Sequence, residues 1–376
     1  MKKFVYFIII LVSIQNFNAQ VFHDTIPFRN DLGLIIIPLK FNNQVKHFAF
    51  DTGAENSVAY GWAKESLKRT NKTITINSSG GLRSKLRFYK SGKIKIGSKT
   101  VSKHRILNAP KNEIFSCHKI DGILGVDIIK LLNWTIDFEN KILVMHPKSY
   151  LPKKGNTFHA LQFDFYKNRP YVFLNHKQKY KLQFLLDTGA GGLSNISKNN
   201  YNLTNLDDLP TKNFYSGSFD VNGILTTTKP VIFKLKNTIS KNVTLSPIIS
   251  YNNRKTSKIG NDLWKNKKLF LSLKKDVFFV SQKNINQKYE GYSCSVMIRD
   301  GKMRILKIEK DSELWKIGLR QGDEILKFNN RTFTDFCELD TYQRNLAKTA
   351  KTAKSFEITL LNNQKVIISK NVVLEE

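Results

Sequence analysis

Cysteine is scarce in this sequence, and its scarcity excludes several kinds of site. The 376 residues include three cysteines, Cys117, Cys294 and Cys337. They are too few and too scattered for a disulfide framework or a cysteine metal cage, and none has a histidine pattern typical of a nucleophilic thiol. At most one pair can form. We expect Cys294 and Cys337 to form it, because both fall in the last region of the chain, and Cys117 to remain a buried thiol.

Acidic residues are also in short supply. Asp and Glu number 30 against 61 Lys and Arg, which gives a formal charge of +31. Such an excess fits a nucleic-acid or anionic-surface binder. The lysines are scattered along the chain, however, and no stacking-aromatic motif or recognition helix accompanies them. We therefore expect no nucleic-acid partner and interpret the lysines as a soluble surface, with a preference for acidic partners as the alternative.

Long apolar runs are confined to the N-terminus. Two lysines precede the apolar run at 4–14, which is well short of the roughly 20 residues needed to cross a bilayer. A polar stretch containing the small residue Ala19 follows. The pattern predicts a signal peptide over residues 1–20 and a periplasmic or secreted protein. Phe17 is unusual so close to a cleavage site, so a membrane tether formed by the uncleaved segment is the alternative.

The composition is otherwise that of a folded protein with more than one domain. A hydrophobic fraction of 41% and an aromatic fraction of 11% exclude a disordered or collagen-like chain. At roughly 150 residues per domain, the length suggests two or three domains.

An internal repeat organises most of the chain. Phe48–Ala54 and Phe184–Ala190 align without gaps on the sequence Asp-Thr-Gly-Ala, and alternating apolar strands precede each copy. We predict polar turns within those strands at Asn42-Asn43 and His176-Lys177. At nearly equal distances downstream, Ile123-Leu124-Gly125 matches Lys258-Ile259-Gly260. A chance tripeptide would not recur with the same flanks and the same downstream partner, so the repeat indicates a duplication.

The repeated aspartate is the candidate for chemistry. Asp51 and Asp187 each follow a buried strand and precede a glycine, Gly53 or Gly189, which allows a tight turn and leaves N–H groups free to face the carboxylate. Two such turns related by a two-fold axis would place the carboxyl groups together. Because like charges that close cannot both ionise comfortably, the pair would share one proton and could activate a water molecule for amide cleavage. That chemistry needs no metal and no cofactor.

These motifs resemble those of retropepsin-type aspartic proteases, with both lobes fused in one chain, over about residues 28–282. The resemblance implies that Asp51 and Asp187 are the catalytic dyad and that Thr52 and Thr188 cross-link the two loops by hydroxyl-to-backbone hydrogen bonds. It also implies that two segments pass behind the aspartates: Ile123, Leu124 and Gly125 behind the first, and Ile259 and Gly260 behind the second. The second copy departs from the pattern at Lys258, where an apolar residue is usual; the departure concerns the local packing and leaves the dyad unchanged.

Ala54 and Ala190 differ from the serine or threonine that pepsin-like enzymes usually carry at this position. A hydroxyl there would stabilise the charged carboxylate, and alanine cannot supply it. We therefore expect raised apparent pKa values for the pair and a pH optimum that is mildly acid to neutral.

Flaps over the site are expected as hairpins between each aspartate and its downstream glycine. In the first copy Asn77–Gly81, with Gly80 and Gly81, has the composition of a mobile tip. In the second copy either Tyr215–Phe219, with Gly217, or Val221–Gly223 would serve. Ordinary hairpin turns are the alternative interpretation.

The pattern changes from about residue 284. Asp300-Gly301 predicts a tight hairpin, Ser312 can cap a short helix that Gly318 ends, and a longer helix is expected over roughly 335–352. The run Gly-Leu-x-x-Gly-Asp-x-Ile-Leu at 318–326 resembles a bacterial PDZ domain. The resemblance implies that a C-terminal peptide adds as a strand and that its carboxylate meets a loop at Gly291, Tyr292 and Ser293. This loop lacks the usual Gly-apolar-Gly-apolar form, so packing against the protease is the alternative role.

The expected fold is mostly β, with two pseudo-symmetric aspartic-protease lobes at 21–150 and 151–283 and a PDZ-like α/β module, a partly open barrel, at 284–376. The expected function is an exported aspartic endopeptidase that cleaves extended polypeptide, with the last module for substrate or partner docking. The alternative is a catalytically inactive peptide-binding protein that keeps the fold.

Overall fold

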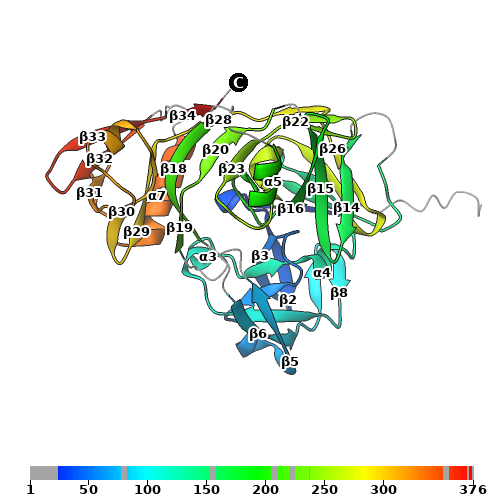
Figure 1. Cartoon of the computed structure of the whole chain (residues 1–376). Helices are drawn as coiled ribbons and strands as arrows, with labels where there is room; N and C mark the ends of the chain where they lie inside the picture. The colour runs from blue at the N-terminus through cyan, green and yellow to red at the C-terminus, as the bar shows by residue number, and fades with distance from the viewer. Residues whose placement is uncertain are drawn as a thin grey trace, which may run out of the picture.

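The computed structural model of the chain is built mainly of β-strands (Figure 1). It describes residues 24–77, 83–152, 158–204, 211–219, 225–236, 238–349, 355–370 and 372–374. The predicted signal peptide at 1–20 lies outside these residues. Within them, no helix is both long and apolar enough to cross a membrane. Below, residues 21–150 are called the first repeat, 151–283 the second repeat and 284–376 the C-terminal segment.

The first repeat forms a nine-stranded sheet in the order β5-β6-β9-β4-β10-β3-β2-β7-β8. The hairpin of β2 and β3 turns at Asn42-Asn43, as predicted, and both residues have positive φ as this tight turn requires. The strand β3 ends in three buried residues, which place the following Asp51 in the interior. The strands are β2 (Ile36–Phe41), β3 (Gln44–Phe50), β4 (Val58–Tyr60), β5 (Lys68–Asn77), β6 (Arg83–Lys90), β7 (Ile94–Ile96), β8 (Lys99–Val101), β9 (Arg105–Ala109) and β10 (Gly122–Leu124).

The second repeat forms a sheet with the corresponding strand order, β18-β20-β23-β17-β24-β16-β15-β21-β22. Every second residue of β15 is buried, as expected of a strand with one face on a core. The turn between β15 and β16 has its positive φ angles at Lys177 and Gln178, and His176 is still paired with Tyr180 in the strands. The predicted turn at His176-Lys177 was therefore placed one residue too early. The strands are β15 (Arg169–His176), β16 (Tyr180–Leu186), β17 (Ser194–Ile196), β18 (Thr211–Phe219), β20 (Val231–Lys234), β21 (Thr238–Ser240), β22 (Val243–Ser246), β23 (Ile248–Tyr251) and β24 (Lys258–Ile259).

A six-stranded sheet joins the two repeats in the order β1-β12-β11-β25-β26-β13. Each repeat supplies three of its strands, and the two sets meet where β11 pairs with β25. Trp134 lies opposite Leu271 and Ile136 opposite Leu269, all within one buried cluster that spans both repeats. The strands are β1 (Asp24–Pro27), β11 (Asn133–Asp137), β12 (Ile142–His146), β13 (His159–Ala160), β25 (Lys268–Ser272) and β26 (Val277–Val280).

The C-terminal segment has an apolar core of its own. The predicted hairpin turns at Asp300-Gly301, both with positive φ, and Ser312 accepts a hydrogen bond from Trp315 N at the start of α6. The main elements are β28 (Tyr289–Gly291), β29 (Cys294–Arg299), β30 (Lys302–Glu309), α6 (Glu313–Lys316), β31 (Ile325–Phe328), α7 (Phe336–Thr349), β32 (Ser355–Leu360), β33 (Lys365–Ser369) and β34 (Val372–Leu374).

The C-terminal segment is joined to the second repeat through a continuous sheet. The strand β18 pairs with β19 (Leu225–Thr228) at one end and with β30 in its middle, where Tyr215 lies opposite Ile308. The Tyr215 ring also stacks on Trp315, with 4.9 Å between the ring centres. In Figure 1 the orange α7 and the gold β29 and β30 accordingly lie on the β18 side of the molecule.

A disulfide joins the C-terminal segment to the first repeat. It links Cys117, at the end of α3 (Glu113–Cys117), to Cys337 in α7, whereas Cys294 is a free, buried thiol. The expected pairing of Cys294 with Cys337 was therefore wrong. Cys294 begins β29 and points into the core of its own segment, while the packing of α3 on α7 brings the other two Cα atoms to 5.4 Å.

Thiol counting tests this pairing. In protein recovered from an oxidising compartment, denaturation without reductant should release one reactive thiol, Cys294, and denaturation with reductant should release three. Cys294 should be unreactive in the native protein, because burial raises the pKa of its thiol to about 12. Removing the cross-link with Cys117→Ser should lower the free energy of unfolding by about 2–4 kcal/mol. Peptide mapping that finds Cys294 bonded to Cys337 would contradict the structure.

Candidate active site

The site lies where two equivalent strands end. Asp51 follows β3 and Asp187 follows β16, and in each repeat a second strand runs parallel beside the first. Through these pairings Asp51 N donates to Leu124 O at 2.9 Å and Asp187 N donates to Ile259 O at 3.1 Å. The residues predicted to pass behind the aspartates thus lie there and fix the backbone from which both carboxyl groups project.

Each carboxyl group is held by the turn that follows it. Gly53 N and Ala54 N donate to Asp51 Oδ1 at 2.7 and 3.1 Å, and Gly189 N donates to Asp187 Oδ1 at 3.1 Å. Ala190 instead has its N–H bonded to the carbonyl oxygen of Asp187. These hydrogen bonds offset part of the cost of burying the two aspartates, which are 9% and 4% exposed.

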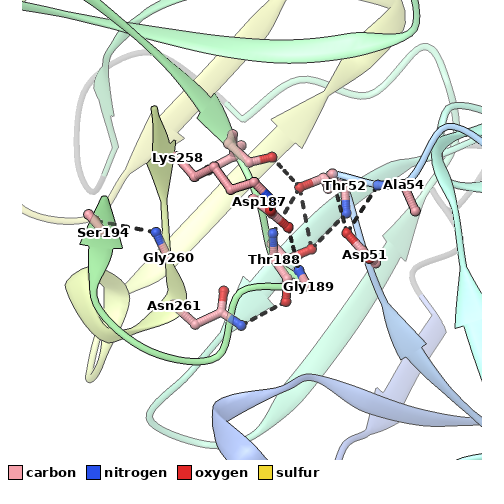
Figure 2. Close-up of polar contacts among 12 residues, drawn as sticks. Asp51, Thr52, Ala54, Asp187, Thr188, Gly189, Ser194, Lys258, Gly260 and Asn261 are labelled. Atoms are coloured by element: carbon pink, nitrogen blue, oxygen red, sulfur yellow. Dashed lines mark hydrogen bonds and ion pairs between the residues drawn. The ribbon is translucent and has the colours of Figure 1, made fainter. Parts of the chain in front are cut away.

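The two carboxyl groups lie against each other's turns (Figure 2). A Cβ atom added to Gly53 would come within 2.5 Å of Asp187 Oδ1, and one added to Gly189 would overlap the Asp51 carboxyl group. Glycine is therefore required at both positions by the close approach of the opposite aspartate. The structure brings the two predicted residues together at one buried site.

The two turns are cross-linked by their threonines. Thr52 N donates to Thr188 Oγ1 at 2.9 Å, and Thr188 N donates to Thr52 Oγ1 at 3.1 Å. Each hydroxyl also donates across the seam, from Thr52 to Leu186 O at 2.5 Å and from Thr188 to Phe50 O at 2.7 Å. Both threonines are fully buried, so these reciprocal bonds hold the two loops at a fixed separation.

Further polar residues support the turns and were not predicted from the sequence. Gly125 N donates to Ser57 Oγ at 3.0 Å, and Gly260 N donates to Ser194 Oγ at 3.3 Å. Asn261 Nδ2 donates to Thr188 O at 2.8 Å. The two serines follow the Asp-Thr-Gly-Ala motifs at nearly equal distances, which is the signal that could have identified them.

Lys258 lies at the site. Its Nζ is 2.5 Å from Asp187 Oδ2, with the lysine side chain 22% and the aspartate side chain 5% exposed (Figure 2). The polar residue at this position does not disturb the pairing of the strands, because β24 keeps its register on β16 and the ammonium group has a carboxylate partner. The departure from the apolar pattern places a positive charge at one of the two aspartates.

The environment makes Asp51 a weak acid. Burial is the main cause, followed by the neighbouring Asp187, and together they raise the pKa of Asp51 to about 7 against the lowering effects of Lys258 and of the hydrogen bond from Gly53. For Asp51 the direction is the one expected from Ala54 and Ala190, but its main causes are burial and the like charge of Asp187.

The remaining predicted site residues are placed as follows. Gly80 and Gly81 lie outside the described residues, as does the Val221–Gly223 segment. Gly217 lies within β18 opposite Thr227, so Tyr215–Phe219 is a strand and the prediction of a turn there was wrong. In the C-terminal segment Gly291 pairs with Val372 of β34, and the carbonyl oxygen of Ser293 accepts a hydrogen bond from Glu309 N. Tyr292 packs its ring against Phe356.

Comparison with known families agrees with this geometry. Residues 37–128 match the aspartyl protease family model, a range that contains Asp51 and Ile123-Leu124-Gly125 but not Asp187. No curated protein gives a significant match to the chain. The matched part of the chain is therefore similar to aspartyl proteases, and the mostly β structure is consistent with that similarity.

The raised pKa of Asp51 predicts how stability varies with pH. The unfolded chain loses this proton near pH 4 and the folded protein near pH 7, so stability should fall as the pH rises through that window. The variant Asp51→Asn lacks this titration and should be more stable than the wild type above pH 7, by up to roughly 4 kcal/mol, with the smallest difference near pH 4. Denaturant unfolding across pH 4–8 measures it.

A second buried aspartate supplies a control of opposite sign. Burial would raise the pKa of Asp137, but hydrogen bonds from Asn140 and Lys268 outweigh burial and lower it. Asp137→Asn should therefore be less stable than the wild type at pH 7, with a difference that shrinks as the pH falls below about 4. If Asp51→Asn behaved like Asp137→Asn, the account of the site would be wrong.

Proposed function

We propose that the protein is an aspartic endopeptidase that cleaves extended polypeptide with a water molecule activated by Asp51 and Asp187. The observation that carries the proposal is the meeting of these two buried carboxyl groups on turns that are cross-linked by Thr52 and Thr188. Asp51 and Asp187 are accordingly the proposed catalytic residues.

The chemistry follows from one shared proton. The ionised carboxylate takes a proton from water while the water oxygen bonds to the peptide carbonyl carbon, and the protonated carboxyl group donates its proton to the carbonyl oxygen. The tetrahedral diol then collapses as the amide nitrogen is protonated and the C–N bond breaks. Every proton in this sequence comes from water or from the carboxyl pair.

Several features support a two-lobed arrangement with pseudo-two-fold symmetry. The repeats have corresponding strand orders, and each supplies three strands to the sheet between them. The threonine bonds are reciprocal across the same seam. On this proposal the lobes are residues 21–150 and 151–283, and the flaps are the β5–β6 hairpin and the hairpin that begins with β18.

Export and peptide docking are further parts of the proposal. The N-terminal run and the Cys117–Cys337 disulfide both favour a periplasmic or secreted location, where disulfides persist. The C-terminal segment is proposed to be PDZ-like, with a peptide adding to β29, the terminal strand of its sheet, beside α7. Gln343 of α7 already donates to Val296 O of β29, so an incoming strand would compete with this hydrogen bond.

A cleavage assay tests the protease and separates it from an inactive peptide-binding protein. The purified protein should cleave an unfolded protein, and Asp51→Asn and Asp187→Asn should each lower the rate by about 10²–10⁴-fold. A hydroxyl-bearing mimic of the tetrahedral intermediate should block the wild type. The rate should peak at mildly acid to neutral pH, and a peak near pH 2 would contradict the geometry. Cleavage that persists in both variants would point to a contaminant, and none in any sample to the binding protein.

Fluorescence anisotropy tests docking at β29. A labelled peptide with a free C-terminal carboxylate should bind saturably, and the same peptide with an amidated C-terminus should bind at least tenfold more weakly. The neutral amide has a single acceptor oxygen, and its NH2 group would face the N–H donors that hold the second oxygen of a carboxylate. The measurement uses Asp51→Asn protein so that the peptide is not cut. Equal binding of both peptides, or none, would leave packing as the role of the segment.

A further inference from the structure

Lys258 makes the candidate active site electrically asymmetric. In the first repeat the equivalent residue is Ile123, which is 4% exposed and packs in an apolar cluster with Val58 and Leu107. In the second repeat the same backbone position, paired with the end of β16, carries an ammonium group at 2.5 Å from Asp187 Oδ2. Two nearly equivalent turns therefore present their carboxyl groups to different neighbours.

The positively charged groups near the two aspartates lie closer to Asp187 and favour its ionised form. Asp187 faces Lys258 directly, and the Arg254 guanidinium, on the loop before β24, is also within its electrostatic reach. Asp51 is more deeply affected by burial and by the charge of Asp187 than by Lys258. When two carboxyl groups share one proton, the negative charge resides on the one with the nearer cations. That carboxyl group is Asp187.

We propose that Lys258 is a positioning residue that keeps Asp187 ionised and so places the shared proton on Asp51. The inference rests on the proposed function and assigns the two roles within it. Asp187 takes the proton from the attacking water, and Asp51 donates its proton to the peptide carbonyl oxygen. Lys258 itself neither gains nor loses a proton in the reaction.

The assignment has a consequence for pH dependence. The singly protonated pair is the reactive form, and the rate falls when the pair gains a second proton or loses its last one. A cation at Asp187 favours the negatively charged forms, so it moves both limbs of the pH–rate profile to lower pH. Without Lys258, both limbs should move to higher pH.

The test compares two lysines that each pair with a buried aspartate. Lys258→Met removes the cation at the site, whereas Lys268→Met removes the partner of Asp137, at 2.9 Å in the sheet between the repeats. Measured as kcat/KM against pH with a fluorogenic peptide, both limbs of Lys258→Met should lie about one pH unit or more above those of the wild type. Lys268→Met should reproduce the wild-type limbs, and Lys258→Arg should nearly do so because it keeps the charge.

A lowered rate with unmoved limbs in Lys258→Met would overturn the inference, since a purely structural role predicts that result. A measurement that does not depend on catalysis distinguishes failure of this inference from failure of the proposed function. With ¹³C in the aspartate carboxyl groups, assigned through Asp51→Asn and Asp187→Asn, NMR at pH 5–6 should show Asp51 protonated and Asp187 ionised in the wild type. In Lys258→Met the two resonances should become more alike. If the Asp51 and Asp187 resonances differ by the same amount in the wild type and in Lys258→Met, Lys258 does not determine which aspartate carries the proton. That conclusion holds whether or not the protein cleaves peptides.

Discussion

The structure depends on one electrostatic constraint, the burial of two carboxyl groups against each other. Such a pair is costly unless hydrogen bonds and a shared proton compensate for the lost hydration. The N–H groups at Gly53 and Gly189 supply part of that compensation, and the reciprocal bonds of Thr52 and Thr188 hold the two turns together. The pairing of β11 with β25 also joins the two repeats that carry these turns.

The repeats use one backbone plan and differ in side-chain chemistry. Both place a parallel strand beside the aspartate strand and use a buried serine to hold the glycine that directly follows that parallel strand. Where the first has Ile123 and Val126, the second has Lys258 and Asn261. The backbone plan brings the acids together, and the side chains that differ decide how charge is distributed between them.

Most of the site was predictable because its signals are local. The duplication identified the aspartates, the glycines and the strands behind them, and dipeptides such as Asn42-Asn43 and Asp300-Gly301 marked hairpins through their backbone preferences. Ser57 and Ser194 could have been found in the same way. Their role as acceptors for Gly125 N and Gly260 N is not local, however, and shows only in the folded chain.

The features that sequence analysis missed depend on long-range packing. The pairing of β18 with β30 joins residues far apart in the chain and has no local signature. The partner of Cys337 was set by the contact of α3 with α7, so closeness along the sequence was a misleading guide. The polarity of Lys258 was noticed, but its partner became clear only when β24 was placed beside β16.

The disulfide also changes what backbone cleavage can do to this molecule. The cross-linked cysteines enclose the whole second repeat in a covalent ring. A single break anywhere inside that ring leaves one continuous molecule, whose two ends separate only after reduction. The part of the chain that contributes Asp187 therefore cannot be shed by one cut, whichever protease makes it.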